Sequence, residues 1–541
     1  MDRRSPMSIP APARSPRISP RCSPCSSPAT ARRFKDDIEA MPRNIDKLLY
    51  TDLLPFDITG GPETREFLNR VADISTDFVE KTFDRGCKIL DFHQPEQLKE
   101  VLDLEIPADP LPLDQLLHDC RDALKYQVKT GHPRFMNQLS CGLEVISLGG
   151  EWLTAAANIN MFTYEIAPVF ILMEQATMRH MRKVIGYKNG DSIMAPGGSV
   201  SNLYAALAAR HKMFPEYKEK GLLALKGQLV MFTSVHSHYS LKGAAASMGL
   251  GTDNLVLVPV DDKGRMIPAE LDRLIEEQKS KGNLPFFVCA TAGTTVMGAF
   301  DPLNPIADIC EKHKLWFHVD AAWGGGVLLS RNTKHKMAGV ERSNSLTWNP
   351  HKLMGVLLQC STVHFQEDGL LISCNQMCAD YLFQQDKPYD VTYDTGDKVI
   401  QCGRHNDIFK FWLLWRSKGD SGFEKHIDHL FDMTAYLVEK LKTNNDKFEL
   451  LNDEPELTNV CFWYVPYRLR TMKPGPERHK LLGEVQPILK GRMMTAGSLM
   501  IGYQPLDHHP NFFRNIISSQ AVCRDDIDFM IVEMDRLGYD L

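Results

Sequence analysis

Between about residues 190 and 370, short apolar segments alternate with segments of helical periodicity. The apolar segments are residues 229–233, 255–260, 285–291, 315–320, 345–348 and 360–365. Two of the intervening segments, 269–279 and 305–312, place apolar residues at helical spacing. Strands that are apolar throughout, rather than at every second residue, are typical of a parallel sheet with helices on both faces. We therefore expect an α/β domain with a mostly parallel sheet.

Residues 1–35 differ in composition from everything that follows. Five Ser-Pro pairs and seven arginines leave too little apolar surface to offset the entropy of ordering, so we expect a disordered tail. Two other interpretations stay open. Arg and Ser richness is also typical of a transit peptide, although the prolines oppose the amphipathic helix that such a peptide needs. Acylation of Cys22 and Cys25 would instead hold the chain at a membrane surface.

Three regions follow the tail: a helical segment over residues 36–135, the α/β domain over 136–424 and a smaller α+β domain over 425–541. The helices expected outside the central domain are 63–81, 113–128, 423–442 and 477–496, and the C-terminal strands are 459–465, 498–504 and 512–518. We expect those strands to be antiparallel, and Pro487 to interrupt the last helix because proline lacks the backbone N–H.

Composition excludes several classes of protein. The 541 residues include 62 Lys plus Arg against 68 Asp plus Glu, and a net charge of -6 does not favour nucleic-acid binding. The sequence has no uninterrupted apolar run of about 18 residues, so we expect no membrane-spanning helix. The 13 cysteines are scattered through apolar contexts and no signal peptide is evident, which predicts a reduced, cytoplasmic protein.

Ligands of open parallel sheets bind at the carboxyl ends of the strands. Asp320, Lys352 and His238 each follow one of the predicted strands, and a glycine turn at 195–202 precedes a predicted helix at 203–212. Singly, each feature has an ordinary explanation: a structural ion pair, a surface lysine, a loop histidine and a turn. Together they match pyridoxal 5'-phosphate (PLP), which needs a lysine for its aldehyde, a carboxylate for its ring nitrogen, a flat group against its ring and an anion site for its phosphate.

The motifs around these residues resemble those of the group II PLP-dependent amino-acid decarboxylases. They are His238, Thr-Ala-Gly-Thr-Thr at 291–295, His-Val-Asp-Ala-Ala-Trp-Gly-Gly at 318–325 and Asn-Pro-His-Lys at 349–352. Within that group the chain resembles the animal glutamate decarboxylases from about residue 48 to its end. The resemblance implies a fold-type I large domain with a mostly parallel seven-stranded sheet, a small α+β domain, and an N-terminal segment that packs on the partner of a homodimer.

The resemblance also implies a role for each matching residue. Lys352 would bond the cofactor aldehyde, Asp320 would face the ring nitrogen and His238 would stack on the ring. Tyr381, on the family's mobile loop, would return a proton to Cα after carbon dioxide leaves. The other implied cofactor contacts are Val200, Ser201, Thr295 and Asn349.

For the substrate, the resemblance implies a site for the distal carboxylate formed by Gln138, Ser140 and Arg514, with Phe162 lining the same pocket. Because an arginine fork fits a carboxylate, the expected substrate is an acidic amino acid. The active sites of the family lie at a dimer interface, so some of these residues would serve the partner's cofactor.

The expected reaction is decarboxylation of L-glutamate to 4-aminobutanoate (GABA). Relatives that act on aspartate or cysteine sulfinate, giving β-alanine or hypotaurine, tend to carry Phe in place of Ser140 and Tyr in place of Phe162. Met136, Cys141 and Ile159 depart from the usual glutamate-type pattern. One methylene in a substrate is worth only about 1–3 kcal/mol, so the alternative substrates stay open on chemical grounds.

Two readings of other classes were weighed. In the first, the chain is a catalytically inactive scaffold that uses its tail for interactions, but the intact Lys352, Asp320 and His238 count against it. In the second, His236, His238, Cys374 and Cys378 bind a metal. Their spacing matches no standard zinc pattern, so we expect no metal.

Overall fold

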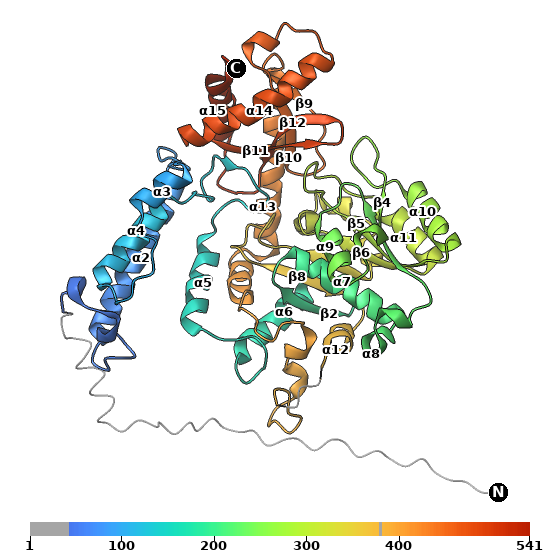
Figure 1. Ribbon diagram of the computed structural model, residues 1–541, viewed down its shortest axis with the longest axis horizontal. Helices are drawn as coiled ribbons and strands as arrows, with labels where there is room; N and C mark the ends of the chain where they lie inside the picture. The colour runs from blue at the N-terminus through green and yellow to red at the C-terminus, as the bar shows by residue number, and fades with distance from the viewer. Residues whose placement is uncertain (1–42, 378–380) are drawn as a thin grey trace. The chain divides into compact units, whose positions relative to one another are not determined.

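The computed structural model describes residues 43–377 and 381–541 (Figure 1). The predicted tail and its two cysteines lie outside the described residues. The described residues form two compact units, one made of residues 43–78 with Val101–Leu124, the other of Val79–Glu100 with the described part of Lys125–Leu541. No helix in the described ranges is long and apolar enough to cross a membrane.

The first unit is helical. It contains most of α2 (Gly61–Phe83) and of α4 (Leu113–Lys125), close to the helices that periodicity predicts. Its small core is built around Ile45, Leu113 and Leu117, with partly buried side chains of α2 packed against them. The backbone N–H of Leu113 donates to the carbonyl of Leu48 at 2.8 Å, which ties the start of α4 to the preceding segment.

The second unit contains a seven-stranded sheet of order β2-β8-β7-β6-β5-β3-β4. The strands are β2 (Asp191–Ala195), β3 (Leu229–Ser234), β4 (Leu255–Val258), β5 (Leu284–Thr291), β6 (Trp316–Asp320), β7 (Ser345–Trp348) and β8 (Ser361–Phe365). The four pairings among β3 to β7 are parallel, whereas β8 pairs antiparallel with β7 and β2. The predicted mostly parallel sheet is confirmed; edge strand β2 was not predicted.

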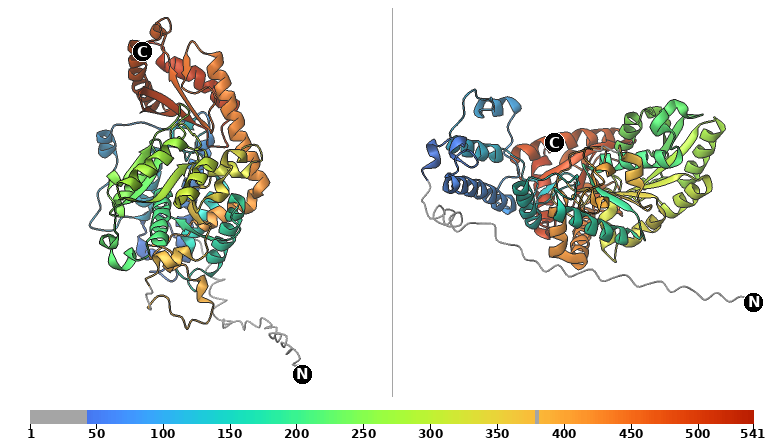
Figure 2. Two further views of the ribbon diagram at one scale, coloured as in Figure 1. Left: turned by 90° about the vertical axis from the view of Figure 1, so that its right-hand side faces the viewer. Right: turned by 90° about the horizontal axis from the view of Figure 1, so that it is seen from below.

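Successive residues of the central strands enter two separate cores. On β3, Val230 and Phe232 belong to one hydrophobic cluster, whereas Leu229 and Met231 belong to the other. Helices cover both faces of the sheet (Figures 1 and 2), which explains why these strands are apolar throughout. The helices of this part are α5 (Val145–Ala157), α6 (Pro168–Ile185), α7 (Gly198–Met213), α8 (Tyr217–Lys220), α9 (Ser240–Ser247), α10 (Pro268–Ser280), α11 (Leu303–His313) and α12 (Leu370–Asn375); α3 (Pro95–Val101) lies at a boundary between the units.

A smaller sheet follows, of order β1-β11-β12-β10-β9. Its strands are β1 (Phe135–Met136), β9 (Phe448–Leu450), β10 (Asn459–Tyr464), β11 (Met500–Leu506) and β12 (His509–Ile516). All its pairings are antiparallel except that of β1 with β11. The accompanying helices are α13 (Ile408–Thr443), which is interrupted at Gly419, α14 (Pro476–Ala496) and α15 (Arg524–Gly538). Figure 2 shows α13 running from the large sheet to the small one.

The prediction that Pro487 interrupts the penultimate helix is wrong. Helix α14 continues from Pro476 to Ala496 with Pro487 inside it. Proline leaves the carbonyl four residues earlier without its helical partner, and that carbonyl belongs to Gly483. The Asn511 side chain donates to the Gly483 carbonyl oxygen at 3.3 Å, so the lost hydrogen bond is replaced from β12. The sequence alone does not show this replacement.

Candidate active site

Asp320 ends β6 and is buried at the carboxyl edge of the large sheet, with 5% of its surface exposed. Its Oδ2 accepts a hydrogen bond from Asn202 Nδ2 at 2.8 Å, and its Oδ1 accepts one from the backbone N–H of Ala322 at 3.0 Å. Both donors are neutral, and no ion pair to this carboxylate forms within residues 43–377 and 381–541. Because a buried carboxylate without a cation is costly, the position favours a cationic ligand group.

Lys352 lies in the turn after β7. Its backbone N–H donates to the Asn349 carbonyl at 3.0 Å, and its own carbonyl accepts from Gly355, whose φ of 70° suits glycine. Burial lowers the pKa of the Lys352 amine, while the charge of Asp320 raises it and that of Arg514 lowers it. These effects place the three side chains within electrostatic reach of one another. A lowered pKa favours the neutral, nucleophilic amine.

His238 follows β3 and joins the same cluster. Burial lowers the pKa of its imidazole, with an opposing effect from Asp320 and a further lowering by Lys352. Its Nδ1 accepts a hydrogen bond from the backbone N–H of Ser240 at 3.2 Å, so the neutral ring carries its hydrogen on Nε2. A neutral, fixed imidazole provides a flat face for a heteroaromatic ring.

The glycine turn joins β2 to α7. Gly197 has a φ of 104° and is followed by the N-terminus of the 16-residue helix α7, which carries Val200 and Ser201 in its first turn. A Cβ on Gly198 would lie 2.6 Å from Asn349 Nδ2, so glycine permits the close approach of that side chain. The turn borders a cavity of about 770 Å³ that Val200 also lines. Free N–H groups at a helix N-terminus favour a phosphate.

These features fit PLP. The carboxylate of Asp320 lacks a cationic partner among the described residues, and Oδ1 of Asn349 is buried without a hydrogen bond there. A protonated ring nitrogen would pair with the Asp320 carboxylate, and a polar atom of the cofactor would bond Asn349 Oδ1. Lys352 supplies the amine for the aldehyde, and the start of α7 supplies the anion site.

Arg514 on β12 is a cation that acts electrostatically on Lys352. Its Nη1 donates to the Thr295 carbonyl at 2.9 Å, and its Nε is buried without a partner. No acidic side chain in the described part of the chain forms an ion pair with it, and burial lowers its pKa. The Thr295 carbonyl also accepts from Asn459 at 3.1 Å, so one carbonyl connects the predicted cofactor turn with the small sheet.

The segment with Gln138 and Ser140 follows β1 beside this arginine. Gln138 Nε2 donates to the Ser140 carbonyl at 3.1 Å, and the Cys141 thiol donates to the Gln138 carbonyl at 2.7 Å. The Cys141 thiol acts electrostatically on Arg514, which places the segment near the guanidinium. The structure thus brings together most of the residues predicted for cofactor and substrate.

No hydrogen bond or ion pair of the described residues links Phe162 or Tyr381 to Lys352 or Arg514. The Phe162 carbonyl accepts from Gly396 at 2.8 Å. Tyr381 is 78% exposed, and its carbonyl accepts from Gln384 at 3.0 Å. The roles of Phe162 and Tyr381 stay predictions.

Sequence reasoning missed the residues that surround Asp320. Asn202 ends the glycine turn but has no predicted role, Ser240 follows His238 by two residues, and His318 stands two residues before Asp320. Asn202 and His318 are 1% and 0% exposed. The sequence shows Asn202 only as a polar residue near the start of a helix, and His318 only as a histidine inside an apolar strand. Neither pattern indicates which side chain the residue bonds.

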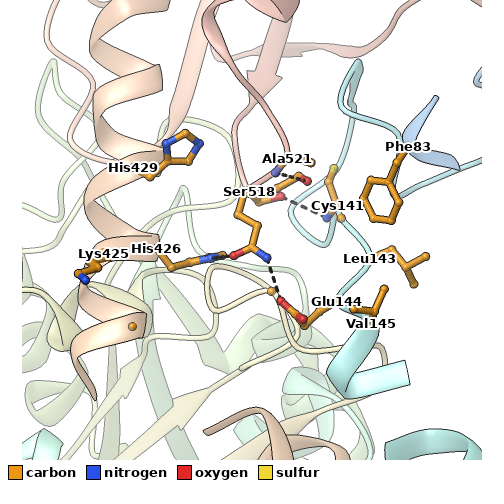
Figure 3. A pocket seen from close by; sticks show the side chains of 15 residues that line it. Phe83, Cys141, Leu143, Glu144, Val145, Lys425, His426, His429, Ser518 and Ala521 are labelled. Atoms are coloured by element: carbon orange, nitrogen blue, oxygen red, sulfur yellow. Dashed lines mark hydrogen bonds between the residues drawn. The ribbon is translucent and has the colours of Figure 1, made fainter. Parts of the chain in front are cut away.

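A separate cavity of about 610 Å³ reaches the Lys352 turn at Gly355 (Figure 3). Helix α13 lines it with His426 and His429, and Cys141 lies on the other side. Nε2 of His426 is 3.0 Å from the carbonyl of Leu353, and burial lowers its pKa to about 4. The neutral His426 therefore donates its Nε2 hydrogen to the Leu353 carbonyl, next to Lys352 in the turn.

No cluster of three or more metal-ligating side chains forms in the parts of the chain that are described. His236 Nε2 lies 2.8 Å from the Asp507 carboxylate, and Cys374 is a buried free thiol. Cys378 lies outside the described residues.

Comparison with known proteins identifies the family. The model described as the pyridoxal-dependent decarboxylase conserved domain matches residues 95–465. The chain belongs to the pyridoxal-dependent decarboxylases. Like other members of this family, it is a carboxy-lyase that uses PLP, as the sequence predicts.

Individual decarboxylases resemble the chain over nearly its whole length. The glutamate decarboxylase of Drosophila melanogaster is 62% identical over 496 residues, 92% of this chain and 97% of that protein. The crystal structure of mouse CSAD in apo form is 46% identical with a TM-score of 0.86, covering 88% of this chain and 99% of its own. The tryptophan decarboxylase of Catharanthus roseus, at 22% identity and a TM-score of 0.77 over 90% of this chain and 100% of its own, shares the fold.

Proposed function

We propose that this decarboxylase converts L-glutamate to 4-aminobutanoate and carbon dioxide. The observation that carries the substrate class is Arg514, whose Nε is buried and unpaired beside Lys352. A guanidinium without an acidic partner suits a ligand that carries a second carboxylate. The 62% identity to the fly glutamate decarboxylase supports glutamate within that class.

For the cofactor, we propose that Lys352 bonds the aldehyde, Asp320 pairs with the ring nitrogen and His238 stacks on one face of the ring. The remaining assigned contacts are Val200, Ser201, Thr295 and Asn349. When bound, PLP supplies an electron-accepting ring that stabilises the negative charge left at Cα. In this assignment Asp320 provides the fixed negative charge that favours a protonated ring nitrogen.

The chain's own groups handle binding and proton transfer. Burial lowers the pKa of the Lys352 amine, which favours the neutral form that bonds a carbonyl carbon. Arg514, Gln138 and Ser140 hold the distal carboxylate, which orients the α-carboxylate for release. In the proposed sequence Tyr381 Oη then donates a proton to Cα, giving the amine.

The exposed Tyr381 serves a neighbouring site if the chain is a homodimer with shared active sites, and we propose that assembly. Helix α5 and the start of α6 support it with exposed apolar side chains: Val145, Trp152, Leu153, Val169 and Leu172 are 43–57% exposed. Such a patch favours a protein partner. Phe162 shortly precedes α6, so in this assembly it lines the partner's substrate pocket.

We also propose the cytoplasm as the working compartment. All ten cysteines of the described residues are free thiols, as expected of a reducing environment.

The test is carbon dioxide release by the purified full-length chain with PLP, measured on glutamate, aspartate, cysteine sulfinate and an aromatic amino acid. We expect the highest kcat/KM for glutamate and negligible turnover of the aromatic acid. Fastest turnover of aspartate would refute glutamate while keeping the acidic class. Fastest turnover of the aromatic acid would refute the role of Arg514.

A further inference from the structure

A row of buried polar side chains lies behind Asp320. Its first member, Asn202 of α7, donates to Asp320 Oδ2 at 2.8 Å. Oδ1 of Asn202 is 3.1 Å from Nε2 of His318, and Nδ1 of His318 is 2.9 Å from the hydroxyl of Ser345 on β7. Trp316 Nε1 donates to that hydroxyl at 2.8 Å. Asn202, His318 and Ser345 are at most 1% exposed, so water does not compete for these bonds.

The direction of each bond follows from its neighbours. Nδ2 of Asn202 donates both to Asp320 and to Ser240 Oγ, at 2.8 and 2.9 Å, so the amide oxygen must face His318. An amide oxygen only accepts, and the hydrogen between the two residues therefore belongs to His318 Nε2.

The state of His318 agrees with this direction. Burial lowers its pKa to about 4, against opposing effects of Asp320 and Ser345, so the ring is neutral. Its hydrogen is on Nε2, and Nδ1 accepts the hydrogen of the Ser345 hydroxyl. The ring stacks on Phe287 with centroids 5.6 Å apart, which fixes its plane. Thr347 Oγ1, at 3.4 Å from Nε2, is the other hydroxyl nearby.

These hydrogen bonds determine which way round the Asn202 amide lies. Its oxygen and nitrogen ends have almost the same shape, so packing alone does not select between the two orientations. With the ends exchanged, the amide oxygen would face the Asp320 carboxylate, and two acceptors would repel each other. The N–H of His318 also opposes that orientation, because it would then face the amide nitrogen, and a buried donor without an acceptor is costly.

We propose that His318 is a positioning residue that locks the Asn202 amide and thereby holds the Asp320 carboxylate in place for the ring nitrogen of PLP. This inference rests on the role of Asp320 in the proposed function. His318 itself touches neither cofactor nor substrate. Its contribution is to keep the strongest side-chain hydrogen bond of Asp320 intact.

The test is the dissociation constant of PLP, measured by fluorescence quenching on the full-length apo-protein. His318→Leu removes the donor and should weaken PLP binding about ten- to a hundredfold. His318→Gln keeps an N–H and should return to within about threefold of the wild type. The matched control is His364→Leu, which removes a fully buried strand histidine bonded to Ser192 and Thr362, and should leave the constant unchanged.

Asp320→Asn separates the positioning role from a general packing defect. In that background His318→Leu should cause no further loss, because the histidine acts through the carboxylate. The inference would be overturned if His318→Leu weakened PLP binding equally with and without Asp320, or if it did not weaken PLP binding at all. Wild-type PLP binding and activity in Asp320→Asn would instead refute the assigned role of Asp320, which is a distinguishable failure of the proposed function.

Discussion

The two charged ends of the site are held in opposite ways. Asp320, on the large sheet, accepts hydrogen bonds at both of its carboxylate oxygens from neutral, buried donors. Arg514, on the small sheet, bonds a single carbonyl and keeps a buried N–H without a partner among the described residues. The difference supports the proposed roles, in which Asp320 is positioned before the cofactor binds and Arg514 gains its partner from the substrate. We therefore expect changes at the two ends to affect different constants.

The largest effect is expected for Asp320→Asn. The substitution removes the charge opposite the ring nitrogen, so kcat/KM for glutamate should fall by about 10²–10⁴-fold. The PLP dissociation constant should rise in the same variant. Steady-state kinetics at saturating PLP, together with a PLP titration, measure both. A variant with reduced kcat/KM and unchanged PLP affinity would contradict the assignment of this end to the cofactor.

Arg514→Leu should separate the substrate end from the cofactor end. It removes the charged donors for the distal carboxylate, so kcat/KM for glutamate should fall by about 10²-fold. PLP affinity should stay within about twofold, because no assigned cofactor contact is lost. The same kinetic and titration assays apply. Equal losses of PLP and glutamate binding would show that the two ends are not independent.

Lys490 allows a test of the hydrogen bonding next to Gln138, a residue assigned to the substrate. Its Nζ donates to Asn137 at 2.6 Å, next to Gln138, and burial lowers its pKa to about 8. A lysine with a lower pKa in the folded than in the unfolded chain binds fewer protons when folded between pH 8 and 10.5, so stability rises with pH there.

Lys490→Met should abolish that rise. The difference in unfolding free energy between wild type and variant should change by about 2 kcal/mol between pH 7.5 and 9.5. Urea unfolding at the two pH values measures it, and groups common to both proteins cancel. A difference independent of pH would mean that Lys490 keeps an ordinary pKa.

The smallest effect is expected for Cys141→Thr. The thiol lies near Arg514 and bonds the Gln138 carbonyl, so the change alters the pocket wall without altering its charge. The ratio of kcat/KM for glutamate and aspartate should shift by less than about tenfold, in keeping with the small value of one methylene. Competition assays with both acids measure it. A loss of all activity would show that the thiol does more than shape the wall.

The sequence predicts the residues expected to react or bind, but not the residues that hold them in position. Lys352, Asp320 and His238 could be predicted because each follows an apolar strand, and strand ends of a parallel sheet meet at one edge. Asn202 and His318 could not, because their roles depend on which side chain of another element each one meets. Pro487 shows the same limit, since the partner of the freed Gly483 carbonyl comes from β12.

Apolar strands and the residues that follow them are local properties of the chain, so the sequence predicts the sheet and the edge at which Asp320, Lys352 and His238 lie. Which charged side chain gains hydrogen-bond partners within the protein depends on the tertiary fold. A hydrogen bond between residues as distant as Asn202 and Asp320 depends on donor and acceptor geometry, which no spacing in the sequence encodes. That geometry gives Asp320 two hydrogen-bond donors and leaves Arg514 Nε without a partner among the described residues, as their proposed roles require.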